Sequence, residues 1–138
     1  MPTKLQSLRR QAFEREGGRC YYCGVRMWLV SPDELPATPR SAGSVAKLQC
    51  TAEHLVPRSE GGRDTLANIA AACAHCNHTR HKRKQPPPPA VYREQVHRRV
   101  ERGSWHDRWV FDLRLLGTVG PGVAVKNQCC TSLRTTVG

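Results

Sequence analysis

Two cysteine pairs in this chain share the spacing of a metal-binding turn. Cys20 and Cys23 form one pair, Cys73 and Cys76 form the other, and two residues separate the members of each. A tight turn with this spacing presents two thiolates to one ion, and four thiolates in a tetrahedral set favour Zn²⁺. We therefore predict one structural zinc site. The alternatives are a redox C-x-x-C pair, which is expected within a βαβ pattern that is absent here, and buried cysteines without a ligand role.

The 49 residues between the two pairs carry a second set of polar residues. Glu53-His54 is followed by a P-x-S-x-G-G turn over 57–62, by Asn68, and by Asn77 directly behind Cys76. Taken singly, these residues have ordinary structural interpretations. A histidine before Leu-Val can be a hydrogen-bonded strand residue, and an asparagine often sits in a turn or caps a helix. Their order and spacing make the combination informative.

This run, over roughly residues 10–84, resembles the HNH endonucleases, the ββα-metal or His-Me finger nucleases, in the subgroup with a zinc knuckle. The resemblance implies an α+β fold: a small ββα-metal core on a four-cysteine zinc site, with helices flanking it on the N- and C-terminal sides. It also implies hydrolysis of DNA phosphodiester bonds. His54 would be the general base, held by a backbone carbonyl, and Asn68 would support its loop through hydrogen bonds to backbone groups.

The resemblance further implies a catalytic divalent ion, Mg²⁺ or Mn²⁺, held by Glu53 and Asn77 through oxygen. His81 lies four residues after Asn77, on the same helical face, and is a candidate further ligand. Two positions depart from the commonest family pattern. Glu53 stands where Asp is more usual, which keeps the carboxylate but lengthens it, and Asn77 stands where many members have His. Arg80 occupies the basic position of a C-N-x-x-[KR] pattern and is expected to contact DNA phosphate.

Basic residues are concentrated next to this motif. The chain has 22 Lys and Arg against 11 Asp and Glu, a net charge of +11, and residues 78–102 account for +6 of it. Such charge binds the phosphate backbone without reading bases. We expect DNA as the partner, with RNA not excluded, and phosphate contacts from Arg80, Lys82, Arg83 and Lys84. The alternatives are a solvated basic helix face, a non-catalytic zinc-dependent nucleic-acid-binding module, and a zinc-stabilised protein-interaction module.

The composition bears on where the protein is located in the cell. No stretch approaches the roughly 20 apolar residues of a membrane helix, so no membrane partner is expected. The first 18 residues have no apolar core of a secretory signal, so we expect a reducing, cytoplasmic location, which favours metal ligation by the cysteines over disulfides. Cys50 is expected to be a buried apolar residue, and Cys129 and Cys130 receive no role. The pattern predicts neither target sequence, nicking or double-strand cutting, nor oligomeric state.

The elements that must position these residues follow from periodicity and breakers. Apolar residues at helical spacing predict a helix over 4–16, stopped by Gly17-Gly18. We expect a strand over 25–30, a loop over 31–46, a strand within 47–57, a helix that begins near Cys73 or Ala74, and a break at the prolines 86–89. A second basic helix over 90–102 is expected to bury Val91, Val96 and Val100. Trp105, Trp109, Val110 and Phe111 would dock the following segment. These elements make up a nuclease domain over 1–112, followed by a poorly structured tail over 113–138.

Overall fold

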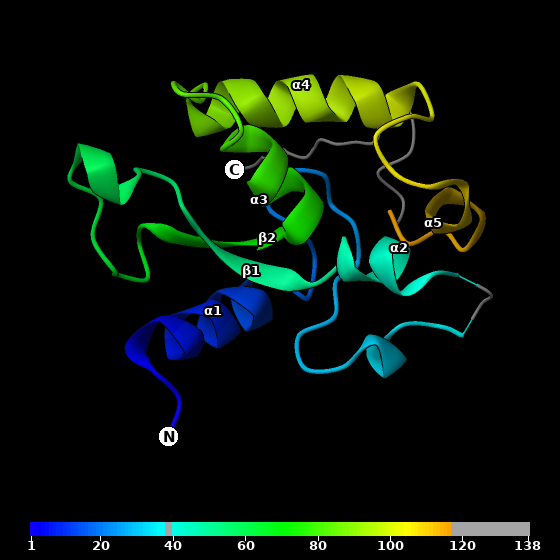
Figure 1. Ribbon diagram of the computed structural model, residues 1–138, viewed down its shortest axis with the longest axis horizontal. Coiled ribbons are helices and arrows are strands. Elements are labelled where there is room, and N and C mark those ends of the chain that lie inside the picture. The colour runs from blue at the N-terminus through cyan, green and yellow to red at the C-terminus, as the bar shows by residue number, and fades with distance from the viewer. Residues whose placement is uncertain (38–39, 117–138) are drawn as a thin grey trace, which may run out of the picture.

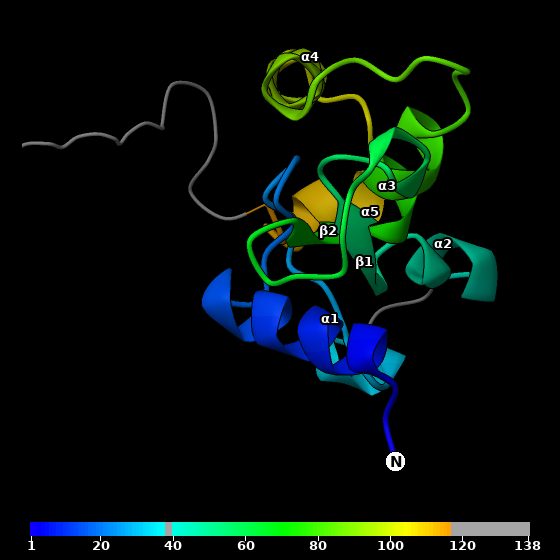
Figure 2. The same ribbon diagram turned by 90° about the vertical axis from the view of Figure 1, so that its left-hand side faces the viewer.

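The computed structural model describes residues 1–37 and 40–116. A two-stranded antiparallel sheet forms its centre, with β1 (Cys50–His54) paired to β2 (Ile69–Cys73). The register sets Glu53 opposite Ala70 and His54 opposite Ile69. Helix α1 (Lys4–Arg15) lies on one side of the sheet, and α3 (Ala74–Arg80) lies on the other, below α4 (Pro89–Glu101) (Figures 1 and 2). The order β1, β2, α3 is the small α+β ββα arrangement that the resemblance implied.

Shorter elements fill the connections. Two 3-10 turns, η1 (Pro32–Glu34) and η2 (Arg58–Glu60), lie before and after β1 in the chain, and α2 (Ala42–Ala46) lies within the segment predicted as a loop. Helix α5 (Arg108–Asp112) follows α4 and packs near α2 (Figure 1). Among the described residues, no helix is long and apolar enough to cross a membrane.

Helix α1 forms as the periodicity predicted. Thr3 and Gln6 make a reciprocal capping box at its start, which satisfies backbone N–H groups that have no partner inside the helix. Leu8 and Ala12 are buried against the sheet, and Gly17 and Gly18 follow with positive φ. At its end, Arg15 donates to the carbonyls of Leu66 and Ile69 and thereby fastens the helix to the start of β2.

The predicted strand over 25–30 is wrong. Its apolar side chains are mostly buried, but its backbone forms only isolated bridges, Arg19 to Arg26 and Trp28 to Gln49. The reason lies in its hydrogen-bond partners. The N–H of Arg26 donates to Leu115, that of Met27 to Gly18 and that of Trp28 to Leu48. Because each residue bonds to a different segment, no regular ladder forms, and the stretch is an extended core segment.

The second basic helix begins and ends within a residue of its prediction. Val96 and Val100 are buried as predicted, whereas Val91 is 48% exposed and Tyr92 is buried in its place. The Tyr92 hydroxyl donates to the Cys76 carbonyl and ties α4 to α3. Beyond α5, Leu115 and Leu116 are buried, so the packed body extends past the boundary predicted at residue 112. Residues 117–138, with Cys129 and Cys130, lie outside the described residues.

Candidate active site and metal centre

The four cysteines of the two C-x-x-C pairs meet in the core. Their sulfur atoms all lie within 4.8 Å of one another, and all four residues are buried. The Cys23 and Cys73 sulfurs are 3.9 Å apart. Tetrahedral zinc with Zn–S bonds near 2.3 Å sets its sulfurs about 3.8 Å apart, so the cluster has the size of such a site.

Backbone N–H groups point at these sulfurs, as expected where thiolates carry negative charge. Tyr22 and Cys73 donate to the Cys20 sulfur, Val25 to that of Cys23, and Cys76 to that of Cys73. Burial raises the pKa of the Cys23 and Cys76 thiols, so four thiolates in this place require a cation to balance them. Cys50 pairs with Cys73 in the sheet but stays outside the cluster. It is buried, as predicted, and burial raises its pKa to about 12.

Glu53 is the centre of a buried polar group beside α3. Its side chain is 1% exposed, and Tyr22 Oη and Arg80 Nη1 donate to its Oε2 over 2.8 and 2.9 Å. Its Oε1 lies 2.9 Å from His81 Nε2, whose side chain is 35% exposed. One carboxylate oxygen is therefore fixed from inside the protein, while the other meets a histidine that faces solvent.

The Glu53 and His81 atoms fit as two ligands of one octahedral ion. Ligand bonds near 2.1 Å at right angles separate two donor atoms by about 3.0 Å, close to the 2.9 Å found here. The remaining positions would be left to water or other oxygen ligands. The imidazole nitrogen is a softer donor than oxygen, which suits Mn²⁺ or a later transition metal as well as Mg²⁺. Asn77 Nδ2 instead donates to Thr51 Oγ1, so the recorded contacts bring His81 to Glu53 but leave Asn77 on Thr51.

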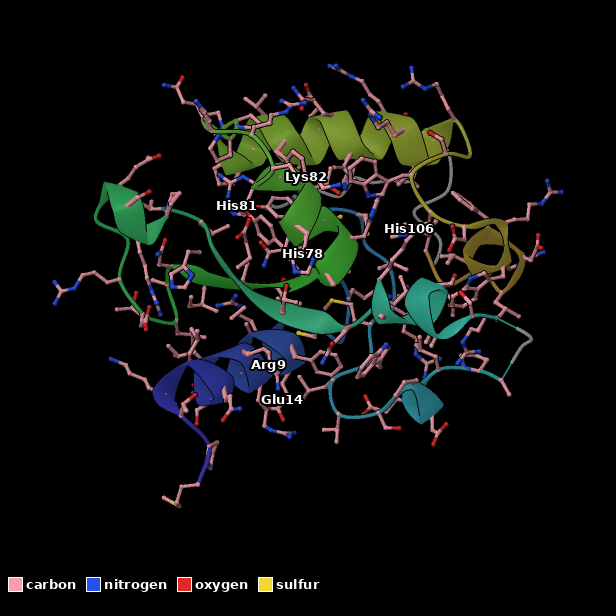
Figure 3. The ribbon with its side chains drawn as sticks, viewed as in Figure 1. Arg9, Glu14, His78, His81, Lys82 and His106 are labelled. Carbon is pink, nitrogen blue, oxygen red and sulfur yellow. The ribbon has the colours of Figure 1, made fainter. Side chains whose placement is uncertain are left out.

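The predicted phosphate contact of Arg80 requires an exposed side chain, but Arg80 is buried. It is 2% exposed, pairs with Glu53, and donates from Nε and Nη2 to the Pro87 carbonyl. The physical reason is helical spacing, because Arg80 lies one turn after the buried Cys76 and shares its face. Lys82, Arg83 and Lys84, which come after the helix, are exposed. Figure 3 shows His81 and Lys82 together at this end of α3, below α4.

His54 ends β1 and faces the loop that joins the strands. Its Nε2 lies 2.8 Å from Asp64 Oδ1, and Arg58 donates to the same carboxylate. These hydrogen bonds, from His54 first and Arg58 second, hold the pKa of Asp64 below its ordinary value. With Nε2 donating to an ionised carboxylate, a neutral imidazole keeps its lone pair on Nδ1. The recorded partner of the ring is thus a side-chain carboxylate rather than the backbone carbonyl that the resemblance implied.

The loop that carries Asp64 is closed by Asn68 and the glycine pair. Asn68 accepts from the Val56 N–H and donates to the carbonyls of Val56 and Arg63, and its role in supporting His54 stays a prediction. Gly62 lies so close to the Val56 carbonyl that an added Cβ would come within 1.6 Å of its oxygen. Gly61 has a φ of +88°, which favours glycine.

Sequence reasoning missed two residues of this site. Asp64 carried a usable signal, because it is a carboxylate in the short loop that the glycine turn folds back toward His54. Tyr22 carried none, since its contact with Glu53 spans 31 residues and depends on how the first cysteine turn packs.

Comparison with known proteins agrees with this geometry. The HNH endonuclease family model matches residues 42–83, which span β1, the loop, β2 and α3. No curated protein and no solved structure matches the chain. The match leaves out Cys20, Cys23 and α4, which the fold brings to the same centre. Residues 42–83 are therefore an HNH endonuclease domain, and with the first cysteine pair they form a four-cysteine cluster that can hold a metal ion.

Proposed function

We propose that this protein is a metal-dependent endonuclease that hydrolyses phosphodiester bonds of DNA. The observation that carries the proposal is the pairing of the buried Glu53 carboxylate with the partly exposed His81 imidazole. Glu53 directly precedes His54 in β1. The HNH match supports nuclease chemistry in general. DNA as the substrate, the identity of both metals and the residue roles are parts of the proposal.

In this mechanism, His54 accepts a proton from water at Nδ1 while Nε2 stays on Asp64. The water oxygen then forms a bond to phosphorus and the bond to the 3′-oxygen breaks. Asp64 holds the ring in one orientation and stabilises its protonated form. A divalent ion on Glu53 and His81, with Asn77 as the alternative second ligand, would supply charge stabilisation for the phosphate and for the leaving oxygen. Tyr22 and Arg80 keep Glu53 in place.

The four-cysteine cluster is proposed to bind zinc with a structural role. Its four sulfurs and closed, buried position are typical of structural zinc sites, which contribute folding free energy directly. Metal analysis of the purified protein should give close to one zinc per chain. A content far below one would contradict this part of the proposal.

DNA binding is proposed to use the basic face, defined here as Lys82, Arg83 and Lys84 with the exposed arginines of α4 and its C-terminal end, Arg93, Arg98, Arg99 and Arg102. Of these residues, Lys82 lies beside His81 (Figure 3). The affinity of electrostatic DNA binding falls steeply with salt. The logarithm of the binding constant falls linearly with the logarithm of the salt concentration, with a slope of about −0.9 for each phosphate neutralised. Replacing Lys82, Arg83 and Lys84 by Ala should lower both affinity and slope. A slope that does not change would remove these residues from the interface.

Plasmid cleavage tests the function itself. The purified protein is incubated with plasmid in the presence of Mg²⁺, Mn²⁺ or Ni²⁺, and with single-stranded DNA and RNA in parallel. The proposal predicts metal-dependent cleavage of DNA. Tight, salt-sensitive binding without cleavage under every metal would favour the non-catalytic binding module instead.

A further inference from the structure

The segment over 103–107, between α4 and α5, covers the four-cysteine cluster from outside the HNH match. Trp105 Nε1 donates to the Cys76 sulfur over 3.3 Å, and His106 Nε2 lies 3.2 Å from the Cys23 sulfur. Both rings are partly buried. Figure 3 shows His106 on the side of α3 away from His81, so this contact is separate from the proposed catalytic centre.

The backbone holds Trp105 in an unusual conformation. Its φ is +87°, a region that bulky residues rarely adopt. Gly103, earlier in the same turn, also has positive φ, and Ser104 Oγ donates to the Arg99 carbonyl, which fixes the turn after α4. The surrounding contacts therefore impose a backbone conformation that a tryptophan would otherwise avoid. In this conformation the indole N–H of Trp105 points at the Cys76 sulfur.

Neighbouring side chains hold the two rings against the cluster. His75 of α3 packs against Trp105 with ring centres 4.6 Å apart and against His106 at 5.4 Å. The Arg99 guanidinium of α4 lies over the Trp105 ring at 5.7 Å. Elements on both sides thus fix the positions of the Trp105 and His106 nitrogens.

We propose that Trp105 and His106 form a second layer of the zinc site, which holds the thiolates of Cys76 and Cys23 and slows release of the metal. A zinc-bound thiolate has no proton, so His106 Nε2 must carry the hydrogen and donate it. Four thiolates on Zn²⁺ leave a net charge of −2, and N–H donors offset part of it. Backbone groups serve Cys20, Cys23 and Cys73, whereas the bond to Cys76 comes from the Trp105 side chain. Second-layer partners of metal ligands typically change metal affinity by about 10- to 100-fold.

The test measures zinc transfer from the intact, zinc-loaded protein to the chromogenic chelator 4-(2-pyridylazo)resorcinol. Trp105→Phe keeps an aromatic ring but removes the N–H, and should speed release about tenfold. Trp109→Phe is the matched control, because its indole N–H bonds to Ser44 Oγ and not to the cluster, and it should release zinc at the wild-type rate. His106→Ala should also speed release, whereas His106→Gln, which keeps an N–H of similar reach, should restore most of the wild-type rate.

A second readout reports on the sulfurs themselves. With Co²⁺ in place of zinc, loss of an N–H bond to a thiolate raises the energy of its lone pair, so the sulfur-to-cobalt absorption should move to longer wavelength in Trp105→Phe but not in Trp109→Phe.

The inference rests on the proposed zinc site, and the two fail differently. A wild-type protein that binds no zinc would overturn both. A zinc-bearing Trp105→Phe variant with wild-type release and an unshifted cobalt spectrum would overturn the second layer alone. If Trp105→Phe does not fold, equal release rates from His106→Ala, His106→Gln and wild type would overturn it.

Discussion

The Glu53 carboxylate and the His81 imidazole meet at 2.9 Å across 28 residues of chain. The other carboxylate oxygen is bound by Tyr22 and Arg80, so Glu53 cannot turn away from His81 without breaking two buried hydrogen bonds. A ligand atom that is fixed in this way loses little freedom when it binds a metal ion, which is the purpose of a preorganised site.

This contact predicts which residue shares the proposed catalytic metal with Glu53. His81→Ala should raise the concentration of Mn²⁺ needed for half-maximal cleavage by about tenfold or more, because it removes a ligand. Asn77→Ala should have a smaller effect on that concentration, since its amide contacts Thr51. Metal titrations of cleavage by the two variants measure the difference. A larger effect from Asn77→Ala would assign the ligand role to Asn77.

Asp64 should link loop stability to pH. Hydrogen bonds from His54 and then Arg58 depress its pKa in the folded protein. A depressed pKa contributes stability that is present above the unfolded value, near 3.9, and is lost as the pH falls through the folded value. The Tm difference between wild type and Asp64→Asn should therefore be largest near neutral pH and shrink as the pH falls below about 4. A difference that is constant with pH would show that the carboxylate charge has no such role.

The same variant should affect catalysis through His54. Asp64→Asn keeps the size of the side chain but removes the charge that orients and stabilises the imidazole. We expect kcat to fall roughly 10- to 100-fold, less than the 10²- to 10⁴-fold contribution of the general base itself, while the affinity for DNA is little changed. Single-turnover cleavage and a binding titration separate the two quantities. Wild-type kcat in Asp64→Asn would exclude it as a positioning residue.

Gly62 should be far more sensitive to substitution than Gly43. An alanine Cβ at Gly62 would lie 1.6 Å from the Val56 carbonyl oxygen, so the loop must move, and the cost in unfolding free energy should be at least about 1–3 kcal/mol. Gly43 lies in α2 with no atom near its added Cβ, so Gly43→Ala should be neutral or slightly stabilising. Urea unfolding of both variants measures this contrast, which equal stabilities would contradict.

Replacement of Arg80 should lower the free energy of unfolding, because its side chain is buried. Arg80→Met leaves the Glu53 carboxylate without its buried cationic partner, and breaking such an ion pair typically costs about 3–5 kcal/mol. Arg98→Met is the control. It removes a pair with Glu94 in which both side chains are mostly exposed, worth about 0.3–0.5 kcal/mol. Unfolding curves with zinc present compare the two. Equal losses would show that the burial of Arg80 does not determine its contribution.

Local patterns predicted the parts of the fold that depend on local physics. Helix α1 follows from apolar spacing, α3 starts at Ala74 as expected, and the C-x-x-C spacing identified all four cysteines of the cluster. The strand over 25–30 failed because strand formation needs a continuous partner, and its backbone groups bond to separate segments. The burial of Arg80 could have been predicted from its helical spacing to Cys76. The contacts of Tyr22, Trp105 and His106 could not, since each depends on how segments distant in the chain pack together.

Replacement of His54 tests the central claim most directly. In a plasmid cleavage assay with Mg²⁺ or Mn²⁺, His54→Ala should lose activity by about 10²- to 10⁴-fold, the usual contribution of a general base. His78→Ala, which removes an exposed histidine of α3, should cleave at the wild-type rate. Both variants should bind one zinc and unfold like the wild type. Cleavage by His54→Ala at the wild-type rate would contradict the assignment of His54 as the base.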